Sequence, residues 1–101
     1  MSKYYNLDDN GQPVPTNIME WAFQEGDWRV GQWFAGDIQV STVFLGLDHQ
    51  WGDGPPILWE TMVFGGELDQ EQERYHTREE TQAGHRAMIE RVLKAQGNGS
   101  E

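Results

Sequence analysis

Cysteine is absent from this chain of 101 residues. Its absence excludes disulfide bonds, thiolate metal ligands and thiol nucleophiles, and it fits a reducing cytoplasm. Long apolar runs are absent too, because no stretch approaches the roughly 18 consecutive apolar residues that a membrane-spanning helix needs. No basic segment precedes an apolar run at the N-terminus. We therefore expect a soluble, cytoplasmic protein with no membrane partner.

Basic residues are scarce. Seven Lys and Arg stand against 17 Asp and Glu, which gives a formal net charge of −10. This balance makes direct binding to the phosphates of DNA or RNA unfavourable. An acidic surface instead suits a basic protein partner or a chelated cation.

Familiar catalytic and nucleotide-binding signatures are also missing. The Ser and Thr residues are not surrounded by the Gly-x-Ser-x-Gly pattern of a serine hydrolase. The glycine-rich run 52–56 leads into an apolar, strand-like segment, and it carries Asp53 where a phosphate loop would carry Lys or Arg. We expect no catalytic residue and no cofactor.

The chain is long enough for one domain with one core, and its five Trp, four Phe and three Tyr supply much of the apolar area. We predict a single α+β domain over residues 1–96, followed by a flexible tail at residues 97–101. Three apolar, β-branched stretches predict strands at Trp28–Phe34, Ile38–Leu45 and Ile57–Phe64. They indicate an antiparallel sheet of three or four strands.

Two helices are predicted from capping boxes. Asn17 and Glu20 precede a short N-terminal helix, and Thr77 and Glu80 precede a C-terminal helix that should end at Gly97. The apolar stripe of the second helix consists of His85, Met88, Ile89 and Val92. We expect this helix to pack on one face of the sheet. The acidic segment Glu67–Glu73 has no apolar period and is predicted to be a solvated loop.

A buried acid and base can be inferred from the strand and helix periods. Alternation places Glu60 among large apolar neighbours, and His85 lies in the stripe of the helix that must cover one sheet face. Glu60 should pair with His85, take up a proton, or face solvent because the helix covers the other face. A pair is either a general acid/base couple or a satisfied polar contact of the core.

The loop that follows Gly46 carries Asp48, His49 and Asp53. These residues, with Glu60 or His85, are suitable metal ligands, but their spacing is incomplete and we predict no metal site. Trp51 in the same loop is either an interface anchor or a core residue.

Three arginines are better anion contacts than this loop. Arg74, Arg78 and Arg86 would have to line a pocket, at a subunit boundary if the chain is oligomeric, for the protein to sequester a nucleotide signal. A solvated helix face explains them more simply.

The chain resembles a family of small proteins encoded by bacteriophages and prophages. The resemblance covers most of residues 38–90 and is carried by the runs 41–49, 54–56, 60–66, 74–75 and 83–85. That family has no assigned activity. The resemblance implies a small acidic accessory protein made in the host cytoplasm during infection, and such proteins are often inhibitors of host defence, including anti-CRISPR proteins.

We therefore predict a non-enzymatic accessory protein that binds and inhibits a host defence protein with a basic, nucleic-acid-binding surface. The predicted contact residues are Asp48, Trp51, Asp53, Glu67, Asp69, Glu71 and Glu73. The alternative is a protein that binds a small molecule or nucleotide, or a small enzyme, with a pocket between the sheet and the C-terminal helix. Its candidate residues are Asp48, His49, Glu60 and His85. The sequence leaves the oligomeric state open, with a dimer as one option.

Overall fold

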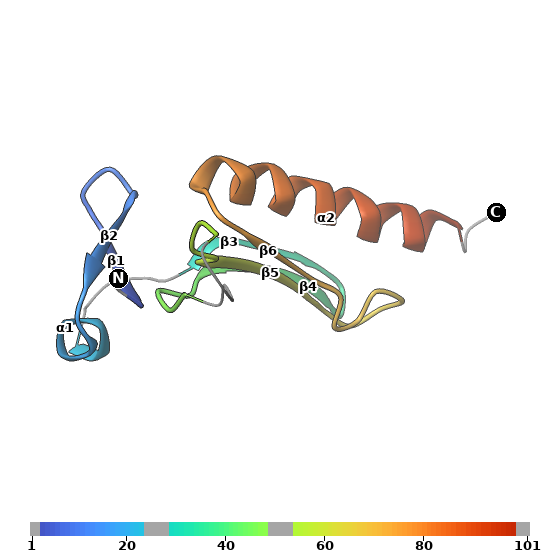
Figure 1. Cartoon of the computed structure of the whole chain (residues 1–101). Helices are drawn as coiled ribbons and strands as arrows, with labels where there is room; N and C mark the ends of the chain where they lie inside the picture. Colours follow the sequence, from blue (N-terminus) through green and yellow to red (C-terminus); the bar gives the residue numbers. More distant parts are fainter. Residues whose placement is uncertain (1–2, 24–28, 49–53, 99–101) are drawn as a thin grey trace.

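The computed structural model describes residues 3–23, 29–48 and 54–98, and within them it has the predicted α+β class. The elements are β1 (Tyr4–Leu7), β2 (Pro13–Thr16), α1 (Ile18–Phe23), β3 (Arg29–Ala35), β4 (Ile38–Phe44), β5 (Trp59–Phe64), β6 (Gln72–Tyr75) and α2 (Arg78–Asn98). β1 pairs with β2, and the other four strands form a second sheet (Figure 1). None of the helices described here is long and apolar enough to cross a membrane.

The larger sheet is an antiparallel meander in the order β3-β4-β5-β6. The three predicted strands are confirmed, with ends that differ by one or two residues over the described part of the chain. The turn between β3 and β4 contains Gly36 at a φ of 58°, a backbone angle that glycine adopts without steric cost. Along β4 buried and half-buried residues alternate, so one face of this sheet is covered.

α2 covers that face (Figure 1). Its predicted capping box is confirmed in both directions: the Glu80 amide donates to Thr77 Oγ1 at 3.0 Å, and the Thr77 amide donates to Glu80 Oε1 at 3.1 Å. The core between helix and sheet consists of Ile38, Val40, Val63, Met88 and Val92. α2 continues through Gly97 to Asn98, so it extends one residue past its predicted end and enters the predicted tail. A helix can continue there because a glycine costs only about 1 kcal/mol relative to alanine.

The segment Glu67–Glu73 is not entirely a loop, which corrects the prediction. Its last two residues begin β6, whose Arg74 lies opposite Glu60 on β5. Backbone pairing along the edge of β5 stabilises this polar strand, so the tertiary partner outweighs the missing apolar period. The preceding turn is held by Asp69, whose carboxylate accepts a hydrogen bond from the Gly65 amide at 2.7 Å.

The N-terminal unit is the β1–β2 hairpin followed by α1. Asn17 caps α1 through the Glu20 amide at 2.9 Å, but the Glu20 carboxylate accepts from the Thr16 hydroxyl instead of closing the predicted box. The Tyr5 amide donates to the Gly46 carbonyl at 2.7 Å, which ties β1 to the end of β4. A second core cluster of Phe44, Leu58 and Trp59 packs with Tyr5 and Leu7 at this junction.

The described chain is elongated. Its radius of gyration is 15.2 Å, and its principal extents are 51 × 29 × 21 Å. A compact domain of about 100 residues has a radius of gyration of about 13 Å. The N-terminal unit lies beyond one end of the larger sheet, and neither described helix covers the face opposite α2 (Figure 1). We call that face the open face.

Candidate ligand-binding groove

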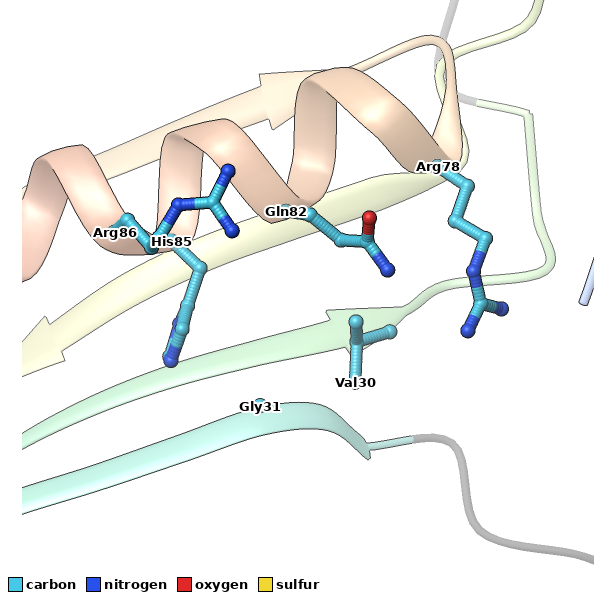
Figure 2. A pocket seen from close by; sticks show the side chains of 6 residues that line it. All are labelled: Val30, Gly31, Arg78, Gln82, His85 and Arg86. Carbon is cyan, nitrogen blue, oxygen red and sulfur yellow. The ribbon is translucent and has the colours of Figure 1, made fainter.

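A cavity of about 300 Å³ lies between α2 and the edge strand β3 (Figure 2). Its lining consists of Val30, Gly31, Arg78, Gln82, His85 and Arg86. We call it the β3–α2 groove. Its volume is at the lower end of the range for small-molecule sites.

The helix supplies a row of polar side chains to this groove. Arg78, Gln82 and Arg86 follow one another at intervals of four residues, so they lie on one side of α2. Eight residues of helix span about 12 Å, which separates the backbone positions of the two arginines. Figure 2 shows Gln82 extending toward Val30 between the two arginines, and His85 extending toward Gly31.

Gly31 sets the depth of the groove. A Cβ atom at this position would lie 2.8 Å from His85 Nε2 and 3.0 Å from His85 Cδ2. Because glycine has no side chain, the imidazole ring can approach the backbone of β3 closely. The strand and the ring therefore form the floor together.

His85 contacts Thr42, the first of two hydrogen-bonded threonines that are buried in the sheet. Its Nδ1 atom lies 2.7 Å from Thr42 Oγ1, which in turn lies 2.6 Å from Thr61 Oγ1. Both hydroxyl groups are buried in the sheet. Burial lowers the pKa of His85 below its ordinary value, and the positive charge of Arg86 lowers it further. The ring is therefore neutral at neutral pH.

The lining has a positive charge in a strongly acidic chain. Its described residues include two guanidinium groups and no carboxylate. Among the described residues, ion pairs join Arg74 to Glu60 and Arg91 to Glu71 and Glu73. Arg78 donates to the Gly11 carbonyl at 3.2 Å, which leaves most of its N–H groups for another acceptor. The described lining thus brings two guanidinium groups to one groove.

The predicted contact between Glu60 and His85 is wrong. Glu60 lies on the open face and pairs with Arg74 at 2.9 Å, whereas His85 reaches Thr42 on the covered face. The strand period explains the difference, because α2 packs on the side of Thr61 and Val63 and adjacent residues point to opposite faces. The carboxylate both pairs and faces away from the helix.

The alternative pocket of Asp48, His49, Glu60 and His85 does not form from its described members. Asp48 accepts a hydrogen bond from the Ile57 amide at 3.1 Å and so joins the two ends of the β4–β5 loop. His49 lies outside the described residues, as do Trp51 and Asp53 of the predicted partner surface. No three His, Asp or Glu side chains come together as a metal site in the described part of the chain.

The remaining acids of the predicted partner surface gather at the β5–β6 turn. Glu67, Asp69, Glu71 and Glu73 are exposed. Arg91 of α2 lies 3.6 Å from Glu71 and 4.0 Å from Glu73, so it neutralises part of this charge. Asp69 has the structural role in the turn described above.

Sequence reasoning identified part of the groove. Arg78 and Arg86 were named as anion contacts and both line it, whereas Arg74, named with them, pairs with Glu60 on the open face. Gln82 was missed, although its position midway between the two arginines gives all three the spacing of a helix face.

The groove has no counterpart from which a function can be transferred. No protein-family model matches the chain, and no significant match to it was found among curated proteins or among solved structures.

Proposed function

We propose that this chain is a non-enzymatic protein that binds a small anionic ligand in the β3–α2 groove. The observation that carries the proposal is a pair of arginines, Arg78 and Arg86, that line one cavity whose described lining contains no carboxylate, in a chain of net charge −10. On α2 itself Glu90 stands four residues after Arg86, at the spacing of a helix ion pair, but it does not line the groove. An anion bound from solution would be the counter-ion of both guanidinium groups within the groove.

The lining suits phosphate or carboxylate groups. Each guanidinium presents a planar fork of N–H donors that binds two oxygens of such a group. The Gln82 amide adds donors between them, and Val30 supplies an apolar surface on the β3 side. Because the arginines arise two helical turns apart, the preferred ligand has anionic groups toward both of its ends.

The same lining supports binding better than chemical conversion. His85 is the group of the lining that titrates nearest to neutral pH, and its Nδ1 atom is engaged by Thr42. A general base needs a free ring nitrogen that reaches the proton it abstracts, and the second nitrogen, Nε2, is turned toward the β3 backbone at Gly31. The family resemblance adds a context to this proposal, namely a phage accessory protein that sequesters a small anion of its host.

The proposal is tested by titrating isotope-labelled protein with pyrophosphate, orthophosphate and succinate and following the amide resonances by NMR. We expect shifts confined to β3 and to the first half of α2. Calorimetry with the tightest of these probes should show that Arg78→Gln and Arg86→Gln each weaken binding by about 10- to 100-fold, the effect of losing one charge-assisted hydrogen-bonding group.

The matched control is Arg91→Gln, which removes an arginine from the same helix outside the groove. Its affinity should equal that of the unmodified protein. Equal weakening by all three substitutions would show that the anions respond only to overall charge. Shifts outside the groove, or none with any of the three probes, would contradict the proposed site.

A further inference from the structure

His85 is the side chain of the described groove lining whose charge can change near neutral pH. It directly precedes Arg86 on α2 and extends toward Gly31 of β3 (Figure 2). Burial lowers its pKa and the charge of Arg86 lowers it further, so a third positive charge is disfavoured beside the two guanidinium groups of the lining. An anion bound among these groups offsets that repulsion and favours the protonated ring.

The groups that face the ring are few. Arg78 and Arg86 line the groove with it on α2. From the sheet, Gly31 of β3 approaches its Nε2 atom and Thr42 of β4 contacts its Nδ1 atom, and neither residue has a charge. The described charge around His85 within the groove is therefore that of the two arginines.

The titratable side chains on the strands packed against α2 lie elsewhere. They are Arg29 of β3, Glu60 of β5, and Glu73, Arg74 and Tyr75 of β6. Arg29 stands opposite Val43 on the open face, where Glu60 and Arg74 pair with each other. Glu73 lies 4.0 Å from Arg91, and burial raises the pKa of Tyr75 and keeps its hydroxyl neutral.

The hydroxyl group of Thr42 suits both charge states of the ring. It lies 2.7 Å from His85 Nδ1 and 2.6 Å from Thr61 Oγ1. A hydroxyl can donate to an unprotonated nitrogen or accept from a protonated one, and in the second case Thr42 can turn its own proton toward Thr61. A backbone carbonyl in the same place could only accept, which would keep a proton on Nδ1. The imidazole can therefore gain a proton without losing its contact with the sheet.

We propose that the β3–α2 groove binds its anion together with one proton from solvent, which the imidazole of His85 takes up. This inference rests on the proposed anion site and adds a third cationic group to it. Because the proton enters with the ligand, the affinity should rise as the pH falls. The rise ends below the lowered pKa that His85 has in the free protein.

Calorimetry with sulfate between about pH 5.5 and about pH 8 tests the inference, because the charge of sulfate is constant over this range. Titrations in two buffers with different heats of ionisation count the protons taken up. We expect up to one proton for each sulfate bound, and an affinity that rises by as much as about tenfold per pH unit. In NMR titrations the ring resonances of His85 should show a higher pKa with sulfate than without it.

Two variants identify the group that takes up the proton. His85→Gln should lose the proton uptake, and its affinity should change by less than about twofold per pH unit. His76→Gln is the matched control, because His76 lies outside the described lining, with its Nδ1 atom 3.1 Å from the Pro55 carbonyl oxygen. That variant should keep the uptake of the unmodified chain. Circular dichroism at each pH verifies that both variants fold.

The outcomes separate this inference from the anion site on which it rests. Sulfate binding that is weakened by Arg78→Gln and Arg86→Gln but takes up no proton would overturn the role of His85 and leave the site in place. Equal loss of uptake in His85→Gln and His76→Gln would assign the pH dependence to overall charge and overturn it as well. Sulfate that fails to bind, or binds equally well to both arginine variants, would overturn both proposals.

Discussion

Replacing Thr42 by valine removes one hydroxyl group from the centre of the sheet and nearly preserves the shape of the side chain. That hydroxyl lies 2.6 Å from Thr61 Oγ1 and 2.7 Å from His85 Nδ1. Thr42 and Thr61 are buried, and His85 is half-buried beside the β3–α2 groove. The substitution therefore leaves one fully buried polar group and one partly accessible polar group without this partner.

The expected loss of stability follows from these two groups. A buried polar group that loses its partner costs about 1–3 kcal/mol. The unpartnered Thr61 hydroxyl should cost an amount in the upper part of that range. His85 should cost an amount in the lower part, because water in the groove can replace its lost contact. We expect the free energy of unfolding to fall by about 2–4 kcal/mol, which corresponds to roughly 10–30 °C in Tm for a domain of this size.

Urea unfolding followed by tryptophan fluorescence measures this change, with the buried Trp59 as one reporter. Ser41→Ala is the comparison variant, because Ser41 also bears a hydroxyl on β4 but faces the open side, where it accepts a hydrogen bond from Gln32 Nε2 at 2.9 Å and water can replace that contact. Its loss should cost about 0.5–1.5 kcal/mol, less than the loss in Thr42→Val. The Thr42→Val, Thr61→Val double variant should lose less than the sum of the two single variants. A Thr42→Val protein within about 0.5 kcal/mol of the unmodified chain would refute a stabilising role for the hydroxyl pair.

Two further predictions concern titration and charge. Because the pKa of His85 is lowered by burial first and by Arg86 second, the unfolded chain binds its proton more readily, so stability should fall as the pH drops below about 6.5. His85→Gln should reduce this loss in urea unfolding at several pH values, and an unchanged pH dependence would contradict the assignment. Reversing Glu67, Glu71 and Glu73 to lysine should abolish salt-sensitive capture of a basic host protein in pull-downs while the fold, measured by circular dichroism, persists. Capture that is unaffected by these reversals would exclude the β5–β6 turn as the contact surface.

Local signals in the sequence located the elements well. The reciprocal bonds of Thr77 and Glu80 involve residues three apart, so they can be anticipated without knowledge of the fold. Likewise, Gly36 between two β-branched runs is enough to indicate the β3–β4 hairpin. Such features depend on contacts within a few residues.

The candidate site was harder to anticipate because it depends on which faces meet. The alternation along β5 could be read, but the face that α2 would cover could not, so the sequence left open whether Glu60 meets His85 or faces away from the helix, and the structure shows the latter. The groove needs the edge strand β3 beside one particular side of α2, which no local pattern specifies. β6 was missed for a similar reason, since its polar residues are stabilised by the neighbouring strand.

Every pairing in the four-stranded sheet joins strands that are neighbours in the sequence. Closing short loops costs little chain entropy, and folding accelerates as the sequence separation of contacts falls. We therefore expect this sheet to assemble quickly, with the β4–β5 pairing as its slowest step because the connection from Phe44 to Trp59 is the longest in the sheet. Asp48 shortens the effective length of that connection by binding the Ile57 amide, so its carboxylate should act on the rate of folding as well as on the finished loop.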